Sequence, residues 1–151
     1  MIPIRPATAA DHPALRALLA ASSLPVEDIA VDTIDFLVAE LDGALLGVVA
    51  VQACGDIGLL RSLTVDANGR GRGLGQALVE RAEAHARARG LLRLVLLRLV
   101  LLTETAAAFF SRRGYVPAER GDMPAQIQST AQFRSLCPAT ASCWSKHLGP
   151  P

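Results

Sequence analysis

A turn rich in glycine and arginine, from Arg70 to Gln76, is the stretch best suited to binding an anion. It follows an apolar run at 57–65 and leads directly into an alanine-rich stretch that predicts a long helix. Glycines let the backbone turn several N–H groups toward one point, and the N-terminus of a helix adds partial positive charge. Arg70 and Arg72 can add charge-assisted hydrogen bonds. The pattern predicts a pyrophosphate site, although a solvated turn that binds nothing would have the same composition.

Two common phosphate-binding patterns do not fit this turn. The dinucleotide pattern G-x-G-x-x-G, begun at Gly71 and Gly73, requires glycine where the chain has Gln76. A P-loop begun at Gly71 fails at the same position, and no Lys-Ser/Thr pair follows. The chain instead has Arg70-x-x-Gly73-x-Gly75 between a predicted strand and a predicted helix.

Arg61 interrupts the otherwise apolar run "IGLLRSLTV" at 57–65. Burying an arginine is costly unless it is paired, so we expect it to face a ligand or a carboxylate. A clamp for an anionic acceptor, such as a carboxylate or an arsonate-like group, and an internal salt bridge both remain open.

The cysteines and histidines do not form a standard metal pattern. Cys54, Cys137 and Cys143 could bind a soft element such as trivalent arsenic, but C-x5-C is not a usual metal spacing, and free cysteines are commonly small buried hydrophobes. The three histidines are scattered along the chain and are interpreted as structural or solvated. We predict no metal site.

Composition restricts the class of protein. The chain has 151 residues, 51% of them hydrophobic, which predicts one domain over 1–151 with a substantial core. The formal net charge of +1 is too balanced for a protein that binds bulk nucleic acid or membrane surfaces. The N-terminal stretch lacks the apolar run of a secretory signal, and the cysteines suit reduced thiols, so we expect a cytoplasmic protein.

Strand and helix patterns alternate along the chain and predict a mixed α/β sheet in one domain. Asp42-Gly43 between two apolar runs is a hairpin signal. The other expected elements are a short strand at 2–8, a helix at 9–21 capped by Asp11, a short helix after Pro25, a strand at 57–65, the helix after the glycine turn, a helix at 105–113, a strand from Tyr115, a short helix near 127–136 and a last strand at 141–147.

The five residues "LLRLV" occur twice in succession between Leu91 and Val100. The apolar run from Leu91 to Leu102 is too short to span a bilayer, which takes about 20 residues, and it reads as a strand buried on both faces. Because a strand typically has about five or six residues, we expect one copy to form the strand and the other to lengthen the connection or the strand end.

The turn R-x-x-G-x-G after "LLRSLTV" resembles the acetyl-coenzyme A loop of the GNAT N-acetyltransferase superfamily. The order of elements is similar over nearly the whole chain. Within the superfamily, the stretches "SLPVEDIA", "GLLRSLTV", "LLTETAAAFFSRRGY" and "FRSLCPATASCWSK" look most like the arsenic-resistance N-acetyltransferases. "LLTETAAAFFSRRGY" is also similar to amino-acid N-acetyltransferases that acetylate glutamate.

The resemblance implies a GNAT fold, with a mixed, mostly antiparallel sheet splayed between its fourth and fifth strands and flanked by helices. It implies acetyl-coenzyme A as cosubstrate, a small-molecule amine as acceptor and direct attack of that amine; a homodimer is left open. The implied cofactor residues are Leu63, Thr64 and Val65 for the pantetheine arm and the thioester carbonyl, Arg70, Gly71, Arg72, Gly73, Leu74, Gly75 and Gln76 for the pyrophosphate, and Thr103, Ala106, Phe109 and Phe110 along the other side.

Two departures from the family pattern affect catalysis. Many members carry Asn and Tyr where this chain has Thr103 and Phe110, and phenylalanine has no proton to give. Many also carry a glutamate on the fourth strand, where "IGLLRS" has no carboxylate. Because an amine must lose a proton before attack, we consider Glu104, Asp28, a water or bulk solvent as the base. Arg61 and Asp28 are the expected acceptor residues, and a catalytically weak acyl-coenzyme A sensor is the alternative function.

Overall fold

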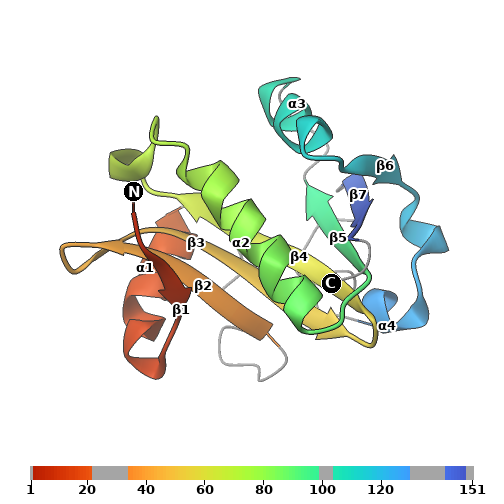
Figure 1. Ribbon diagram of the computed structural model, residues 1–151, viewed down its shortest axis with the longest axis horizontal. Helices are drawn as coiled ribbons and strands as arrows, with labels where there is room; N and C mark the ends of the chain where they lie inside the picture. The colour runs from red at the N-terminus through yellow and green to blue at the C-terminus, as the bar shows by residue number, and fades with distance from the viewer. Residues whose placement is uncertain (1, 22–33, 99–103, 130–141, 149–151) are drawn as a thin grey trace.

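The computed structural model describes residues 2–21, 34–98, 104–129 and 142–148, with only the backbone of residues 96–98, 104–107, 120 and 142. Within these residues, seven strands form one sheet in the order β1-β2-β3-β4-β5-β7-β6 (Figure 1). All neighbouring strands are antiparallel except β4 and β5, which are parallel. The strands are β1 (Ile4–Pro6), β2 (Ile34–Leu41), β3 (Ala44–Cys54), β4 (Ile57–Val65), β5 (Arg93–Arg98), β6 (Val116–Ala118) and β7 (Ser142–His147).

Helices cover both faces of this sheet. The α-helices are α1 (His12–Ala21), α2 (Leu74–Ala88), α3 (Glu104–Arg112) and α4 (Ala125–Gln128). Three leucines of α1 pack with alternate residues of β2 and β3, including Val38 and Val48. Helix α2 crosses the opposite face (Figure 1), where Leu78 and Ala82 pack with the intervening residues of the same strands. Burying each such leucine stabilises the fold by about 1.5–3 kcal/mol, and the alternation confirms the predicted α/β fold.

The first helix begins differently from the expectation. A short 3-10 turn at Ala9–Asp11 precedes α1, and the capping residue is Thr8, so the prediction of Asp11 as the cap is wrong. Asp11 instead occupies the third position of a capping box, where its carboxylate accepts the Thr8 backbone N–H at 2.7 Å. Hydrogen bonds from Arg5 hold the pKa of Asp11 well below its ordinary range.

The predicted hairpin is confirmed. Strands β2 and β3 are joined by Asp42 and Gly43 alone, both at positive φ (52° and 82°), as a two-residue hairpin turn of the primed type requires. Strand β3 pairs in turn with β4 over almost its whole length. Together with β1, which pairs with β2, these three strands form the continuous half of the sheet.

A bulge in β4 separates this half from the rest. Ala50 pairs with Arg61 and Val48 with Thr64, so two residues of β4, Ser62 and Leu63, face the single residue Val49. Ser62 has φ of 62°, a left-handed conformation that is rare for a residue with a side chain. A bulge of this kind bends its strand and increases the local twist.

Strands β4 and β5 part just before this bulge. Their pairing covers only three residues of each strand and ends at Leu59 and Val95, although β4 continues to Val65 and β5 to Arg98. Strand β5 stays paired with β7 over all six of its residues. The predicted splay between the fourth and fifth strands is therefore confirmed.

Both copies of the repeated pentapeptide contribute to one strand, whereas the expectation was that one copy forms the strand and the other lengthens the connection or the strand end. Strand β5 runs across the junction, with Arg93, Leu94 and Val95 from the first copy and residues 96–98 from the second. The first copy pairs with both β4 and β7, whereas the second pairs with β7 only. The junction between the copies thus coincides with the point where the sheet opens.

The remaining elements lie close to their expected positions. Helix α3 begins one residue earlier than predicted, β6 begins one residue after Tyr115, and α4 ends at Gln128. The short helix expected after Pro25 and most of the one expected near 127–136 lie outside the described residues. Within the described ranges, no helix is both long enough and apolar enough to cross a bilayer.

Deleting five residues of the repeat is expected to preserve the sheet. Removal of either copy gives the same sequence, in which Leu101, Leu102 and Thr103 take the places of residues 96–98. Because β5 keeps its residues opposite β4 and two leucines after them, we expect a melting temperature within about 4 °C of the parent protein, or roughly 1 kcal/mol. Thermal unfolding followed by circular dichroism measures this.

A five-residue deletion at 47–51 is the control, because β3 is paired on both sides there and should not tolerate it. A repeat deletion that fails to fold would show that both copies are needed for the strand.

Candidate functional site

The glycine-arginine turn connects the end of β4 to the start of α2, as the sequence predicts. Asp66 begins it with a 3-10 turn at Ala67–Gly69, and its side chain accepts the backbone N–H of Asn68 at 3.0 Å. Gly71 and Gly73 have φ of 77° and 69°, and a Cβ added at either would meet no atom within 4 Å. The backbone of this turn therefore faces open space on the side where those side chains would be.

The two arginines of the turn are available for a ligand. Arg70 and Arg72 are exposed, and neither makes a hydrogen bond or an ion pair within the described part of the chain. Helix α2 starts at Leu74, so its unpaired N–H groups and its positive end lie beside them. Turn, cations and helix end together suit a pyrophosphate group.

The edge of β4 beyond Leu59 offers backbone groups to a ligand. Within the described residues, no strand pairs with Leu63, Thr64 and Val65 on the β5 side, and backbone donors and acceptors on that edge make no sheet bonds there. The buried hydroxyl of Thr64 has no hydrogen-bond partner in the described residues. Buried polar groups normally have a hydrogen-bond partner. A buried hydroxyl without one, at a position predicted to contact the cofactor, is therefore consistent with a ligand contact.

Arg61 is buried, with 4% of its surface exposed, and the side chains of Gln52 and Ser62 are among its neighbours. Its Nη1 donates to Gln52 Oε1 at 3.2 Å, and its Nε approaches Ser62 Oγ at 3.5 Å. The guanidinium carries five donors in a planar array, a geometry that matches a carboxylate or another oxyanion. The sequence alone did not indicate Gln52 or Ser62 as its neighbours.

The two faces of the sheet carry the two halves of the candidate site. Arg61 pairs with Ala50, which packs in the cluster around α1, so Arg61 lies on the α1 face. Gly75 and Gln76 belong to α2, on the other face. A ligand on one face can reach a ligand on the other only past an edge or between separated strands, and β4 and β5 cease to pair beyond Leu59 and Val95.

Helix α3 supplies the opposite wall on the α2 face. A Cβ at Gly75 would lie 3.7 Å from the Phe109 ring, which places this helix against the first turn of α2. Phe110 is 3% exposed and packs edge-to-face on Phe109 and Tyr115, with ring centroids 5.1 and 5.7 Å apart. Phe110 is a core residue. At this position many family members carry a tyrosine that can donate a proton, and phenylalanine has no proton to donate. Thr103 lies outside the described residues, and Ala106 is described by its backbone alone.

Neither carboxylate proposed as a base can be placed at the site. Asp28 lies outside the described residues, and Glu104 is the first residue of α3, described by its backbone alone. The thiols do not replace them: burial raises the pKa of Cys54, and Cys143 is buried in an apolar cluster with Leu59. Cys137 lies outside the described residues. No cluster of three or more His, Cys, Asp or Glu side chains occurs within the described ranges.

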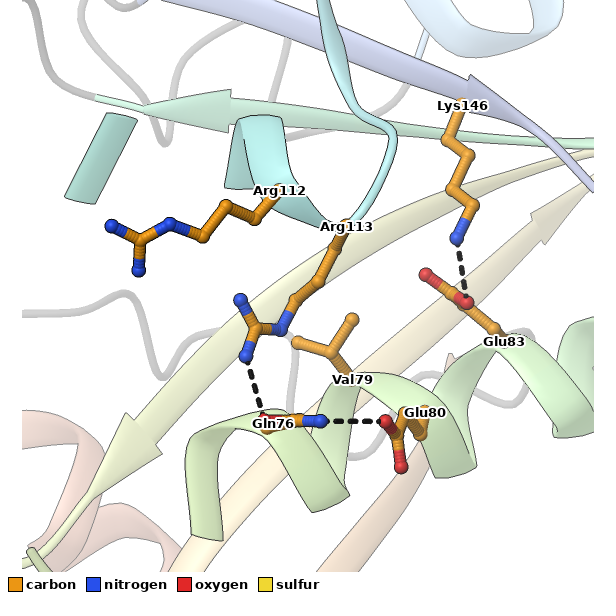
Figure 2. Close-up of a pocket in the computed structure, with 7 residues that line it drawn as sticks. All are labelled: Gln76, Val79, Glu80, Glu83, Arg112, Arg113 and Lys146. Atoms are coloured by element: carbon orange, nitrogen blue, oxygen red, sulfur yellow. Dashed lines mark hydrogen bonds and ion pairs between the residues drawn. The ribbon is translucent and has the colours of Figure 1, made fainter. Parts of the chain in front are cut away.

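A cavity of about 460 Å³ adjoins the glycine-arginine turn on the α2 face (Figure 2). Helix α2, the end of α3 and strand β7 line it with Gln76, Val79, Glu80, Glu83, Arg112, Arg113 and Lys146. Of these residues, the sequence interpretation had included only Gln76. The adjacent pair Arg112-Arg113 before Gly114 was the available signal, because it follows two aromatic residues at the end of a predicted helix.

Two residues that line this cavity, Glu83 and Lys146, belong to a buried polar cluster. Glu83 is 6% exposed and accepts hydrogen bonds from Tyr115 Oη and Lys146 Nζ, both at 3.0 Å. Burial and the nearby carboxylate raise the pKa of Tyr115 above its ordinary range. Removing one member of a buried pair costs on the order of 3 kcal/mol. The cluster therefore fixes α2, which packs on β3 and β4, to the strands beyond the opening.

Comparison with known proteins places this arrangement in a family. The model of the acetyltransferase (GNAT) domain matches residues 32–117. Glucosamine 6-phosphate N-acetyltransferase 1 of Oryza sativa subsp. japonica is 35% identical over 66 residues, or 44% of this chain and 38% of that protein. An amino-acid acetyltransferase of Ralstonia nicotianae is 36% identical over 95 residues, or 62% of this chain and 20% of that protein. The chain thus spans less than half the length of either relative.

A solved structure has a similar fold over almost all of the chain. Rv2747 from Mycobacterium tuberculosis, in complex with CoA, has 27% sequence identity and a TM-score of 0.76, with 96% of this chain and 98% of that one covered. The family match extends from just before β2 to β6, so it includes the opening between β4 and β5 and the turn before α2. With this match over more than half of its length, the chain belongs to the GNAT acetyltransferase family.

Proposed function

We propose that the protein transfers the acetyl group of acetyl-coenzyme A to the amine of a small molecule. The observation that carries the proposal is the opening of the sheet between β4 and β5 directly beside an anion-binding turn. The family and the two curated relatives, both named as acetyltransferases, support the same reaction.

The residues present fit coenzyme A. Arg70, Arg72 and the N-terminus of α2 would hold its pyrophosphate, where the glycine backbone is accessible. The free edge of β4 at 63–65 would hold the pantetheine arm by backbone hydrogen bonds, with Phe109 on the other side. When bound, coenzyme A supplies the acetyl group as a reactive thioester.

The acceptor would bind on the α1 face and reach the acetyl group through the opening. Arg61 lies on that face, buried and next to the bulge, and would bind an acceptor carboxylate or another oxyanion. If acetyl-coenzyme A and the acceptor amine approach each other from opposite faces of the sheet, the amine can attack the thioester directly. No enzyme-bound acyl group is then needed. The raised pKa of the Cys54 thiol agrees with direct attack, because a cysteine nucleophile must react as its thiolate.

The acceptor class that we favour is a small amino acid or an amino-acid-like organoarsenical. The buried guanidinium of Arg61 matches a planar carboxylate or an arsenic oxyanion, and the Ralstonia relative is named an amino-acid acetyltransferase. Asp28 or Glu104 would take the proton that the amine must lose, with water or solvent as the alternative. A role in arsenic resistance would follow from the arsenical substrate.

Turnover by the wild-type protein and by Arg61→Lys tests this function. Thiol release from acetyl-coenzyme A, measured with a panel of amines, should show activity with small α-amino acids or amino-acid-like arsenicals. Arg61→Lys should lower kcat/KM for these acceptors at least tenfold, because a bidentate contact is lost, and should leave acetyl-coenzyme A binding nearly unchanged.

Arg93→Lys is the matched control, since Arg93 is a half-buried strand arginine bonded to Ser145, near the paired end of β5. Cofactor binding without any thiol release would favour a sensor, and equal turnover by wild type and Arg61→Lys would remove Arg61 from the acceptor site.

Gly73→Ala tests the cofactor turn. A methyl group there would enter the open space above the backbone, where the pyrophosphate would bind, so affinity for acetyl-coenzyme A should fall at least tenfold in calorimetry. Gly43→Ala is the control, because Gly43 also has positive φ and empty surroundings but lies in the β2–β3 hairpin. If both variants bind acetyl-coenzyme A like the wild type, the turn does not hold the pyrophosphate.

A further inference from the structure

The cavity between α2 and the end of α3 begins where the proposed pyrophosphate site ends. Gln76 lies in the first turn of α2 and also lines the cavity, so the two regions share a residue. The cavity volume of about 460 Å³ falls within the range of small-molecule sites, about 300–1,000 Å³. A ligand held at the turn can therefore extend into it.

Most charged side chains of the cavity are already engaged. Glu83 is held by Lys146 and Tyr115. Glu80 accepts a hydrogen bond from the side-chain amide nitrogen of Gln76 at 3.0 Å. The side-chain oxygen of Gln76 accepts one from Arg113 Nη2 at 2.9 Å. Arg113 also donates to the Phe109 carbonyl at 2.8 Å, and its guanidinium carbon lies 3.8 Å from the centre of the Phe109 ring. These contacts make Arg113 part of the wall.

Arg112 differs from its neighbours in the cavity. It is exposed and makes no hydrogen bond or ion pair within the described residues. Figure 2 shows its side chain extended beside that of Arg113, with no interaction drawn to it. Lys146 balances the charge of Glu83 directly. Arg113 balances the charge of Glu80 through Gln76, which is hydrogen-bonded to both. Within the described part of the chain, Arg112 is therefore the lining charge without an opposite partner, and the lining residues carry an excess of one positive charge.

We propose that Arg112 binds the 3′-phosphate of coenzyme A and so selects this cofactor over its dephospho form. This inference rests on the proposed function, which places the pyrophosphate at the turn. Coenzyme A carries one further anionic group, a phosphate monoester on the ribose at the nucleotide end of the molecule. A free guanidinium on the cavity next to the pyrophosphate site can bind that monoester by two parallel hydrogen bonds.

Affinities for coenzyme A and 3′-dephospho-coenzyme A test the proposal. Wild-type protein should bind coenzyme A roughly tenfold or more tightly than the dephospho form, and this preference should shrink as salt is raised. Arg112→Gln should lose the preference and bind both ligands with the wild-type affinity for dephospho-coenzyme A. The unchanged dephospho-coenzyme A affinity also shows that the variant is folded.

Arg81→Gln is the matched control, because Arg81 is another exposed arginine, lies on α2 and does not line the cavity. It should keep the full preference. A wild type that binds both ligands equally, or an Arg112→Gln variant that keeps the preference, overturns the inference while leaving the proposed function standing. An Arg112→Gln variant with altered KM for the acceptor but unaltered preference assigns Arg112 to the acceptor and also overturns it. Absence of any coenzyme A binding overturns both proposals.

Discussion

The loss of pairing between β4 and β5 is the constraint on which the rest of the structure depends. Two parallel strands that pair at Leu59 and Val95 would ordinarily continue to pair. The bulge at Ser62 and Leu63 prevents this, because two residues there occupy the space opposite Val49 and bend β4. The left-handed conformation of Ser62 has an energetic cost, and such cost is commonly found at functional sites. The opening is therefore specified locally by the chain.

An open sheet needs other contacts to keep its two parts together. Helix α2 provides them, since its apolar residues pack on β2, β3 and β4, while Glu83 bonds Tyr115 and Lys146 beyond the opening. The same helix presents its N-terminus to the glycine-arginine turn. Helix α2 thus joins the two parts of the sheet and also contributes to the proposed anion site. This links the stability of the sheet to the geometry of the proposed cofactor site.

Local patterns in the sequence predicted most elements. A hairpin turn, a glycine-rich turn and the regular spacing of apolar residues are all properties of neighbouring residues. The Asp42-Gly43 hairpin, the strand at 57–65 and the turn before α2 are examples. Features that depend on distant residues were not predicted. The cluster around Glu83 joins residues 32 and 63 positions apart, and the cavity beside Arg112 exists only because α3 packs against α2. The strand across the repeat junction depends on pairing with β7, which no local pattern shows.

The central claim is that one ligand occupies both the glycine-arginine turn and the free edge of β4. Amide hydrogen exchange with and without acetyl-coenzyme A tests it most directly, because protection is read for each segment separately. We expect slower exchange at 70–76 and at 62–65 together when the ligand is added, with exchange in β1 and β2 unchanged. Protection that is confined to other segments, or no change at saturating ligand, would contradict it.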